Sequence, residues 1–156
     1  MKNNKGFTVV ELITSFALTM IITVFLFEVL IEVKDVFAET SVKTAIQEKL
    51  GIISKNIKAA LPSDGTYLSC LDNTCNISGA VNSKIVIDKG DETTPAKVTV
   101  GNQVFNLPDG TVIEDYSLNS YVNPDDYNCY LSIYLKLNHS SLSKPYEYKI
   151  TFYYFL

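Results

Sequence analysis

The fold of this chain is decided close to its N-terminus, by the stretch Lys5-Gly6-Phe7-Thr8-Val9-Val10-Glu11-Leu12. A short basic head ends at Gly6, and the chain turns apolar from Phe7. Glu11 lies inside this apolar run, where a carboxylate is costly and therefore indicates a functional group that needs a partner. Cleavage after Gly6 would create such a partner, because the new α-ammonium group of Phe7 would lie about one helical turn from Glu11.

This stretch resembles the class III signal of type IV pilins and pseudopilins. In that family a basic leader ends in Gly, and Phe-Thr-Leu-x-Glu-Leu then opens an apolar helix. The resemblance implies that a prepilin peptidase cleaves after Gly6 and methylates the new amine of Phe7, and that Glu11 is the assembly residue. An ordinary signal anchor, whose Glu11 reaches toward the cytoplasmic interface, is the alternative. The family positions are filled by Gly6, Phe7, Thr8, Glu11 and Leu12, with Val9 in place of the usual Leu.

The length and charge of the chain limit what it can do. Its 156 residues suffice for one compact domain and a long anchor. The net charge of −4 gives no general attraction to nucleic acid, and all 13 basic residues are Lys, which lacks the planar fork of Arg. Direct nucleic-acid binding is therefore not expected.

The N-terminal half of the chain is predicted to be one long helix. Its apolar run from Phe7 to Ile31 has spanning length, and a single span in lipid must be helical to satisfy its backbone groups. One apolar stripe then continues to Leu61, and Pro62 ends the helix. The alternative is two helices broken near Thr40-Ser41. The stripe consists of Val29, Val33, Val36, Ala45, Ile46, Leu50, Ile53, Ile57 and Leu61.

The chain after Pro62 is predicted to form short antiparallel strands joined by turns. In residues 127–138 and 146–156 apolar side chains occupy every second position, which is typical of strands with one buried face. The helix stripe around Leu50 is the obvious cover for that face. The predicted fold is therefore α+β, a long N-terminal helix packed on a C-terminal antiparallel β-sheet, as in pilins. The expected strands are 66–70, 75–78, 84–88, 96–100, 103–107, 111–121, 127–138 and 146–156.

These boundaries divide the chain into four parts. They are a cleaved leader at 1–6, a transmembrane and assembly helix at 7–31, an amphipathic helix at 32–61 and an extracytoplasmic β-rich domain at 62–156. Lysines flank the apolar run on its N-terminal side, so the positive-inside tendency places the N-terminus in the cytoplasm and the C-terminus outside. We expect a single-pass protein of the cytoplasmic membrane that later enters an extracytoplasmic filament.

Three cysteines, Cys70, Cys75 and Cys129, allow three pairings and leave one thiol over in each. A Cys70–Cys75 disulfide would close a small local loop across two short strands. A long-range bridge from Cys129, which would join the first hairpin to the rest of the sheet, is the competing pairing.

No motif for catalysis is found, so we expect no enzyme, no cofactor and no metal site. His139 is the only histidine, and it lies in a polar turn, where it is interpreted as a solvated loop residue. Two groups of acidic residues also fall at turns, and turn chemistry explains Asp at such places without a bound ion. These groups are Asp88, Asp91 and Glu92, and Asp125 and Asp126.

Two functions from different classes remain open. The first is a structural subunit, most like a minor pilin or minor pseudopilin, of a type IV pilus, competence or type II secretion-like filament. The resemblance implies the partners of such a subunit: prepilin peptidase, other pilin or pseudopilin subunits, an inner-membrane assembly platform and the lipid bilayer. The second is a stand-alone membrane-anchored binding or adhesion domain that faces outside. Cleavage after Gly6 discriminates between them.

Overall fold

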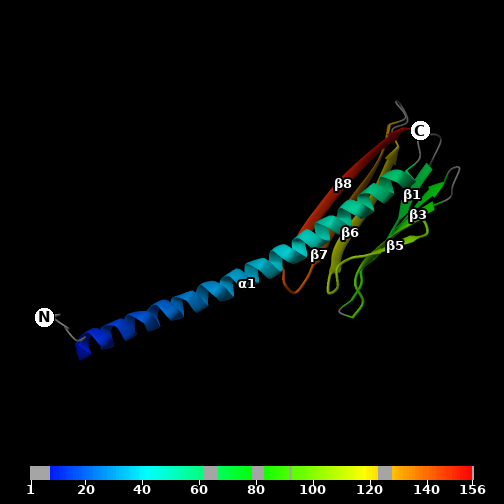
Figure 1. The fold of residues 1–156 in the computed structure, drawn as a ribbon. Coiled ribbons are helices and arrows are strands. Elements are labelled where there is room, and N and C mark those ends of the chain that lie inside the picture. The colour runs from blue at the N-terminus through cyan, green and yellow to red at the C-terminus, as the bar shows by residue number, and fades with distance from the viewer. Residues whose placement is uncertain (1–7, 62–66, 79–82, 92, 123–127, 156) are drawn as a thin grey trace. The chain divides into compact units, whose positions relative to one another are not determined.

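A computed structural model describes residues 8–61, 67–78, 83–91, 93–122 and 128–155. Within these residues one long helix, α1 (Val9–Ala60), is followed by eight strands (Figure 1). The helix is continuous through Thr40-Ser41, so the alternative of two helices is wrong. The chain forms two compact units, residues 1–38 and 39–156, and α1 contributes to both. The strands are β1 (Tyr67–Leu71), β2 (Thr74–Ser78), β3 (Ser83–Asp88), β4 (Lys97–Val100), β5 (Gln103–Asn106), β6 (Val112–Val122), β7 (Asn128–Asn138) and β8 (Tyr146–Phe155).

The strands form two antiparallel sheets, whereas the sequence predicted a single sheet. One sheet has the order β1-β2-β3-β4-β5 and the other β6-β7-β8. Edge strands β1 and β6 of the two sheets lie next to each other, and the Ser120 hydroxyl donates a hydrogen bond to the Leu68 carbonyl at 3.4 Å. Alternation of apolar residues shows which face of a strand is buried but not which strands pair, so the division into two sheets was not visible in the sequence.

The 39–156 unit has one hydrophobic core, to which the helix and both sheets contribute. The helix buries a single stripe, and its members are between 0% and 4% exposed. A cavity of about 10 Å³ is lined by Leu50 of the helix, Ile85 of the first sheet and Ile133 of the second, so the helix packs on both sheets. The prediction that the stripe covers the sheet is thereby confirmed. The buried members of the stripe are Ile46, Leu50, Ile53 and Ile57.

One turn of this unit requires glycine. Gly90 has a φ of +69°, which side-chain-bearing residues rarely adopt, and a Cβ atom there would lie 2.5 Å from the Ala96 nitrogen. This turn brings the chain from β3 toward β4, and the Asp91 N–H donates to the Thr94 carbonyl within it. In contrast, Gly51 lies on the exposed side of α1, where a Cβ atom would meet nothing within 4 Å.

Candidate functional site

Helix α1 begins with a capping box formed by Thr8 and Glu11. The Glu11 carboxylate accepts hydrogen bonds from the Thr8 backbone N–H and from the Thr8 hydroxyl, both at 2.9 Å. In return, the Glu11 N–H donates to the Thr8 hydroxyl oxygen at 3.3 Å. This reciprocal arrangement satisfies two backbone donors that the first turn of a helix would otherwise leave without partners.

The side chains that follow Glu11 are apolar on all sides of the helix. Leu12, Phe16 and Ile21 are each more than 60% exposed in the 1–38 unit. This segment belongs to the one described helix that is long and apolar enough to cross a membrane, with a mean hydropathy of 2.3 in its most apolar window. Such a surface is unstable in water, and it requires lipid or other apolar helices around it.

The few hydroxyl groups in this segment bond to the backbone of their own helix. The Thr14 hydroxyl donates to the Val10 carbonyl at 2.9 Å, Thr19 to Ser15 at 2.8 Å and Thr23 to Thr19 at 2.7 Å. Each polar group is therefore satisfied without water, as a lipid environment requires. Glu11 is the exception, because its carboxylate carries charge as well as hydrogen-bonding capacity.

Comparison with known proteins matches this segment to a family. Residues 1–27 match the family model described as the prokaryotic N-terminal methylation motif. The match supports a type IV pilin-like protein. The chain has no match among the curated proteins and none among the solved structures.

The motif identifies the N-terminus of this pilin-like protein as a class III prepilin signal. Such a signal implies processing by a prepilin peptidase and assembly with other pilins, and it fits a membrane-anchored protein. Chains of this family are structural subunits. Gly6 and Phe7, at the expected cleavage site, lie outside the described residues.

The role of Thr8 as the cap of the helix was missed in the sequence, although its signal was present. A Thr followed three residues later by Glu, directly before an apolar run, is the spacing of a capping box. From the sequence, Glu11 is expected to pair with a cation, whereas in the structure the neutral donors of Thr8 also bind it. The structure adds these two donors to the account of how the carboxylate is accommodated.

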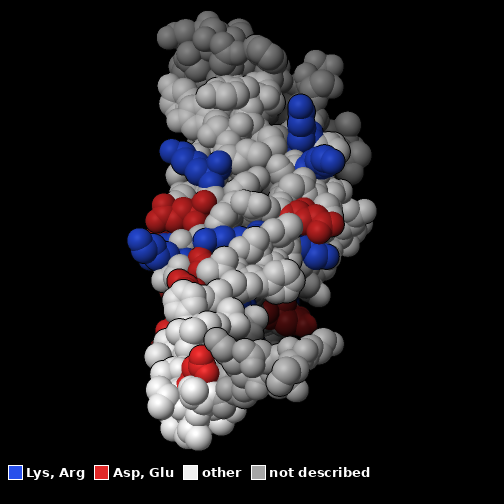
Figure 2. Space-filling view, turned by 60° about the vertical axis from the view of Figure 1, so that its left-hand side comes forward, with Lys and Arg blue, Asp and Glu red and all other residues white. Residues whose placement is uncertain are grey.

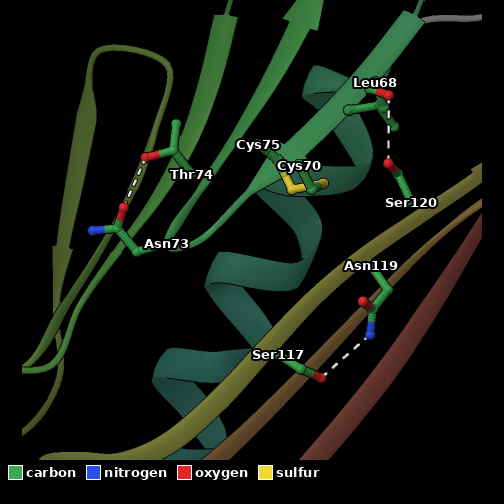
Figure 3. Close-up of a disulfide and its surroundings, with 8 residues drawn as sticks. All are labelled: Leu68, Cys70, Asn73, Thr74, Cys75, Ser117, Asn119 and Ser120. Carbon is green, nitrogen blue, oxygen red and sulfur yellow. Dashed lines mark hydrogen bonds between the residues drawn. A yellow bond between two sulfur atoms is a disulfide. The ribbon is translucent and has the colours of Figure 1, made fainter.

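The cysteines of the pilin-like chain lie in two places. Cys70 and Cys75 face each other across the β1–β2 hairpin, with their Cα atoms 4.0 Å apart, and are joined by a disulfide (Figure 3). Cys129 is buried in β7 opposite Tyr154 of β8. Burial, with a contribution from the neighbouring Cys129, raises the pKa of the Tyr154 hydroxyl to about 12.

His139 and Asp91, two other residues considered from the sequence, make local hydrogen bonds in the structure. His139 is half-buried rather than solvated: its Nδ1 accepts from the Ser141 N–H at 3.0 Å, and its Nε2 therefore carries the proton and donates to the Asp109 carbonyl at 3.1 Å. Asp91 accepts three hydrogen bonds from Thr93 and Thr94, as expected for a turn residue. Glu92, Asp125 and Asp126 lie outside the described residues.

Proposed function

We propose that this protein is a minor pilin or minor pseudopilin of a type IV pilus, competence or type II secretion-like filament. Prepilin peptidase removes residues 1–6 and methylates the amine of Phe7. The segment 7–31 then holds the chain in the cytoplasmic membrane, with its C-terminal domain outside. The amphipathic segment 32–61 and the β-rich segment 62–156 form the part of the subunit that stands outside the membrane.

The observation that carries the proposal is the position of Glu11. It lies in the first turn of an apolar helix, within the matched methylation motif. Thr8 supplies neutral hydrogen-bond donors, which orient the carboxylate but do not neutralise it. The α-ammonium group of a processed Phe7, the chain's own or a neighbour's, would supply the positive charge, and pairing with a neighbour's would remove two costly charges from lipid at once. We therefore assign Glu11 to assembly.

The assignment to the minor class rests on the character of the helix. Many major pilins carry Gly and Pro in the first helix, where it can loosen during packing. Here no Pro lies between Phe7 and Leu61, and the first Gly after Gly6 is Gly51. An unbroken α1 agrees with this feature. A helix without such breaks is expected in a subunit whose helix stays intact when the subunit enters the filament.

Processing is the first test of this function. We expect the mature chain in cells with an active prepilin peptidase to begin at a methylated Phe7, as read by intact mass and N-terminal sequencing. Gly6→Leu should block cleavage, because a bulky side chain hinders close approach of the peptidase to the backbone. A wild-type chain that keeps residues 1–6 in such cells would rule out the proposal and favour the stand-alone membrane-anchored binding or adhesion domain.

Assembly through Glu11 is tested by separating its charge from its capping role. Glu11→Gln keeps a side chain that can still accept from Thr8 but removes the charge, since Gln also occurs in capping boxes. Thr8→Ala does the opposite: it removes the side-chain cap and keeps the carboxylate. The measured quantities are cleavage, membrane insertion and incorporation into filaments, together with capture of other minor subunits, because a subunit at the tip has no neighbour above it.

If the charge is the assembly contact, Glu11→Gln and Glu11→Val should both lose incorporation and capture while cleavage and insertion continue. Thr8→Ala should lose far less, because an N-cap contributes only about 1 kcal/mol. Wild-type incorporation and capture by Glu11→Gln would show that the carboxylate serves the helix cap alone.

A further inference from the structure

A groove of about 850 Å³ lies in the 39–156 unit, between the last turns of α1 and strand β8. The helix side of the groove carries two lysines, Lys55 and Lys58. The other side is a continuous segment of β8, residues 150–154. The lining residues are Ser54, Lys55, Lys58, Ala59, Leu61, Ile150, Thr151, Phe152, Tyr153 and Tyr154.

The lining shows that the groove follows the free edge of β8. Side chains of successive strand residues point to opposite faces of a sheet, yet all five residues from Ile150 to Tyr154 line this one groove. A groove that runs along the edge of a strand meets residues of both faces in this way. β8 is the last strand in the order β6-β7-β8, so none of the described strands pairs with this edge.

Among the described residues, the edge carries no charged side chain where it borders the groove. The first half of β8 carries Glu147 and Lys149 on its outward face, and charged side chains are a common guard against pairing with another chain. The second half, Ile150–Tyr154, has no charge and no proline, and its residues favour strands. Tyr153, which points outward from it, is 79% exposed. This half of β8 can therefore accept an additional strand.

The helix side of the groove is positively charged. Lys55 and Lys58 are exposed and lie one turn apart on α1. Neither has a carboxylate partner among the described residues, although other lysines form ion pairs, such as Lys43 with Glu39 at 2.6 Å. None of the described residues that line the groove is acidic. On the face drawn in Figure 2, basic side chains lie nearest the top of the described part, and below them basic and acidic side chains are interspersed.

We propose that this groove binds an extended acidic segment of another polypeptide, which adds to β8 as an extra strand. Its main chain pairs with the free edge at residues 150–154, and its carboxylates face Lys55 and Lys58. Main-chain pairing supplies the affinity and the lysines supply the specificity, as in other complexes formed by strand addition. The five edge residues extend over roughly 16 Å at about 3.3 Å per residue, which suits a peptide of similar length. The inference does not depend on filament assembly.

A labelled peptide of alternating Glu and Val tests the proposal with the full chain in detergent micelles, by fluorescence anisotropy. We expect saturable binding that weakens at least tenfold in the double variant Lys55→Glu, Lys58→Glu. The matched control is Lys49→Glu, Lys84→Glu, which makes the same change of charge at two exposed lysines outside the groove, and its affinity should stay within twofold of wild type.

Main-chain pairing is tested by N-methylating the peptide at alternate residues, in two complementary sets. Only every second N–H of an added strand points toward β8. One methylated set should therefore lose at least tenfold in affinity, and the other should bind nearly as well as the parent peptide. Absence of binding at millimolar peptide, equal losses in the two double variants, or indifference to both methylated sets would each overturn the proposal. The last result would indicate electrostatic adsorption only.

Discussion

Truncation of Leu50 tests whether the helix is held on the sheets by its buried stripe. Leu50 is 1% exposed and lines a small cavity. Leu50→Ala would enlarge this cavity, and the buried neighbours around it are not expected to move far enough to fill the space. The three carbon atoms removed correspond to about 2.4 kcal/mol at about 0.8 kcal/mol each. The cost of the enlarged cavity raises the expected loss to about 3–5 kcal/mol. Ile52→Ala is the matched control, because Ile52 is 40% exposed on the same helix and its truncation should change stability by about 0.5 kcal/mol or less.

The assay is guanidinium unfolding of the full chain in nonionic detergent, followed by tyrosine fluorescence. Equal unfolding free energies for the Leu50→Ala and Ile52→Ala chains would refute the packing. The double variant Leu50→Ala, Ile133→Ala adds a second check, because Leu50 and Ile133 line the same cavity. Their losses should therefore deviate from additivity by at least about 0.5 kcal/mol. Strict additivity would show that the two side chains do not share a site.

Three further predictions concern the turns and the hairpin. Gly90→Ala should destabilise the chain by about 1–3 kcal/mol, because Gly90 has a positive φ and a Cβ atom there would meet Ala96. Gly51→Ala, in the helix, should instead stabilise the chain by up to about 1 kcal/mol. Equal effects of the two variants in denaturant unfolding would contradict this prediction. Hydrogen bonds from Thr93 and Thr94 hold the pKa of the Asp91 carboxyl below its ordinary value of 3.8. The stability that the Asp91 carboxylate contributes is therefore present above pH 3.8 and lost as the pH falls further, so unfolding across pH should show the deficit of Asp91→Ala shrinking in acid. Reduction of Cys70–Cys75 should cost about 2 kcal/mol, as chain entropy predicts for so short a loop, and unchanged stability in reductant would exclude that contribution.

The elements of the fold were predictable from the sequence because each has a local signature. Pro62 ends the helix pattern, and the end of α1 at Ala60 agrees with it. The alternation in residues 127–138 and 146–156 reappears as β7 and β8, each with one buried face. The division into two sheets was not predictable, because strand pairing depends on contacts between residues distant in the chain, such as Ser120 with Leu68.

The prepilin signal, like the elements of the fold, was predictable from the sequence. The spacing of Gly6, Phe7 and Glu11 identified the signal, because that combination of charge and apolar length is rare. The groove beside β8 was not predictable. Lys55 and Lys58 look in the sequence like an ordinary solvated helix face, and nothing local shows that the free edge of a strand lies beside them.

The two halves of α1 are stable in different surroundings, and the charge of Glu11 determines which surroundings suit the first half best. From Leu12 to Phe27 the helix is uncharged and its hydroxyls bond to its own backbone, so lipid and apolar helices cover it about equally well. Transfer of this segment from the bilayer into a bundle of similar helices therefore changes its apolar contacts little. The Glu11 carboxylate breaks that balance, because in lipid its only expected cation is the α-ammonium of its own processed Phe7, whereas the proposed filament would add the α-ammonium of a neighbour's Phe7. In the proposed filament the apolar surface allows the subunit to leave the membrane, and the single charge makes departure with a neighbour more favourable than remaining alone.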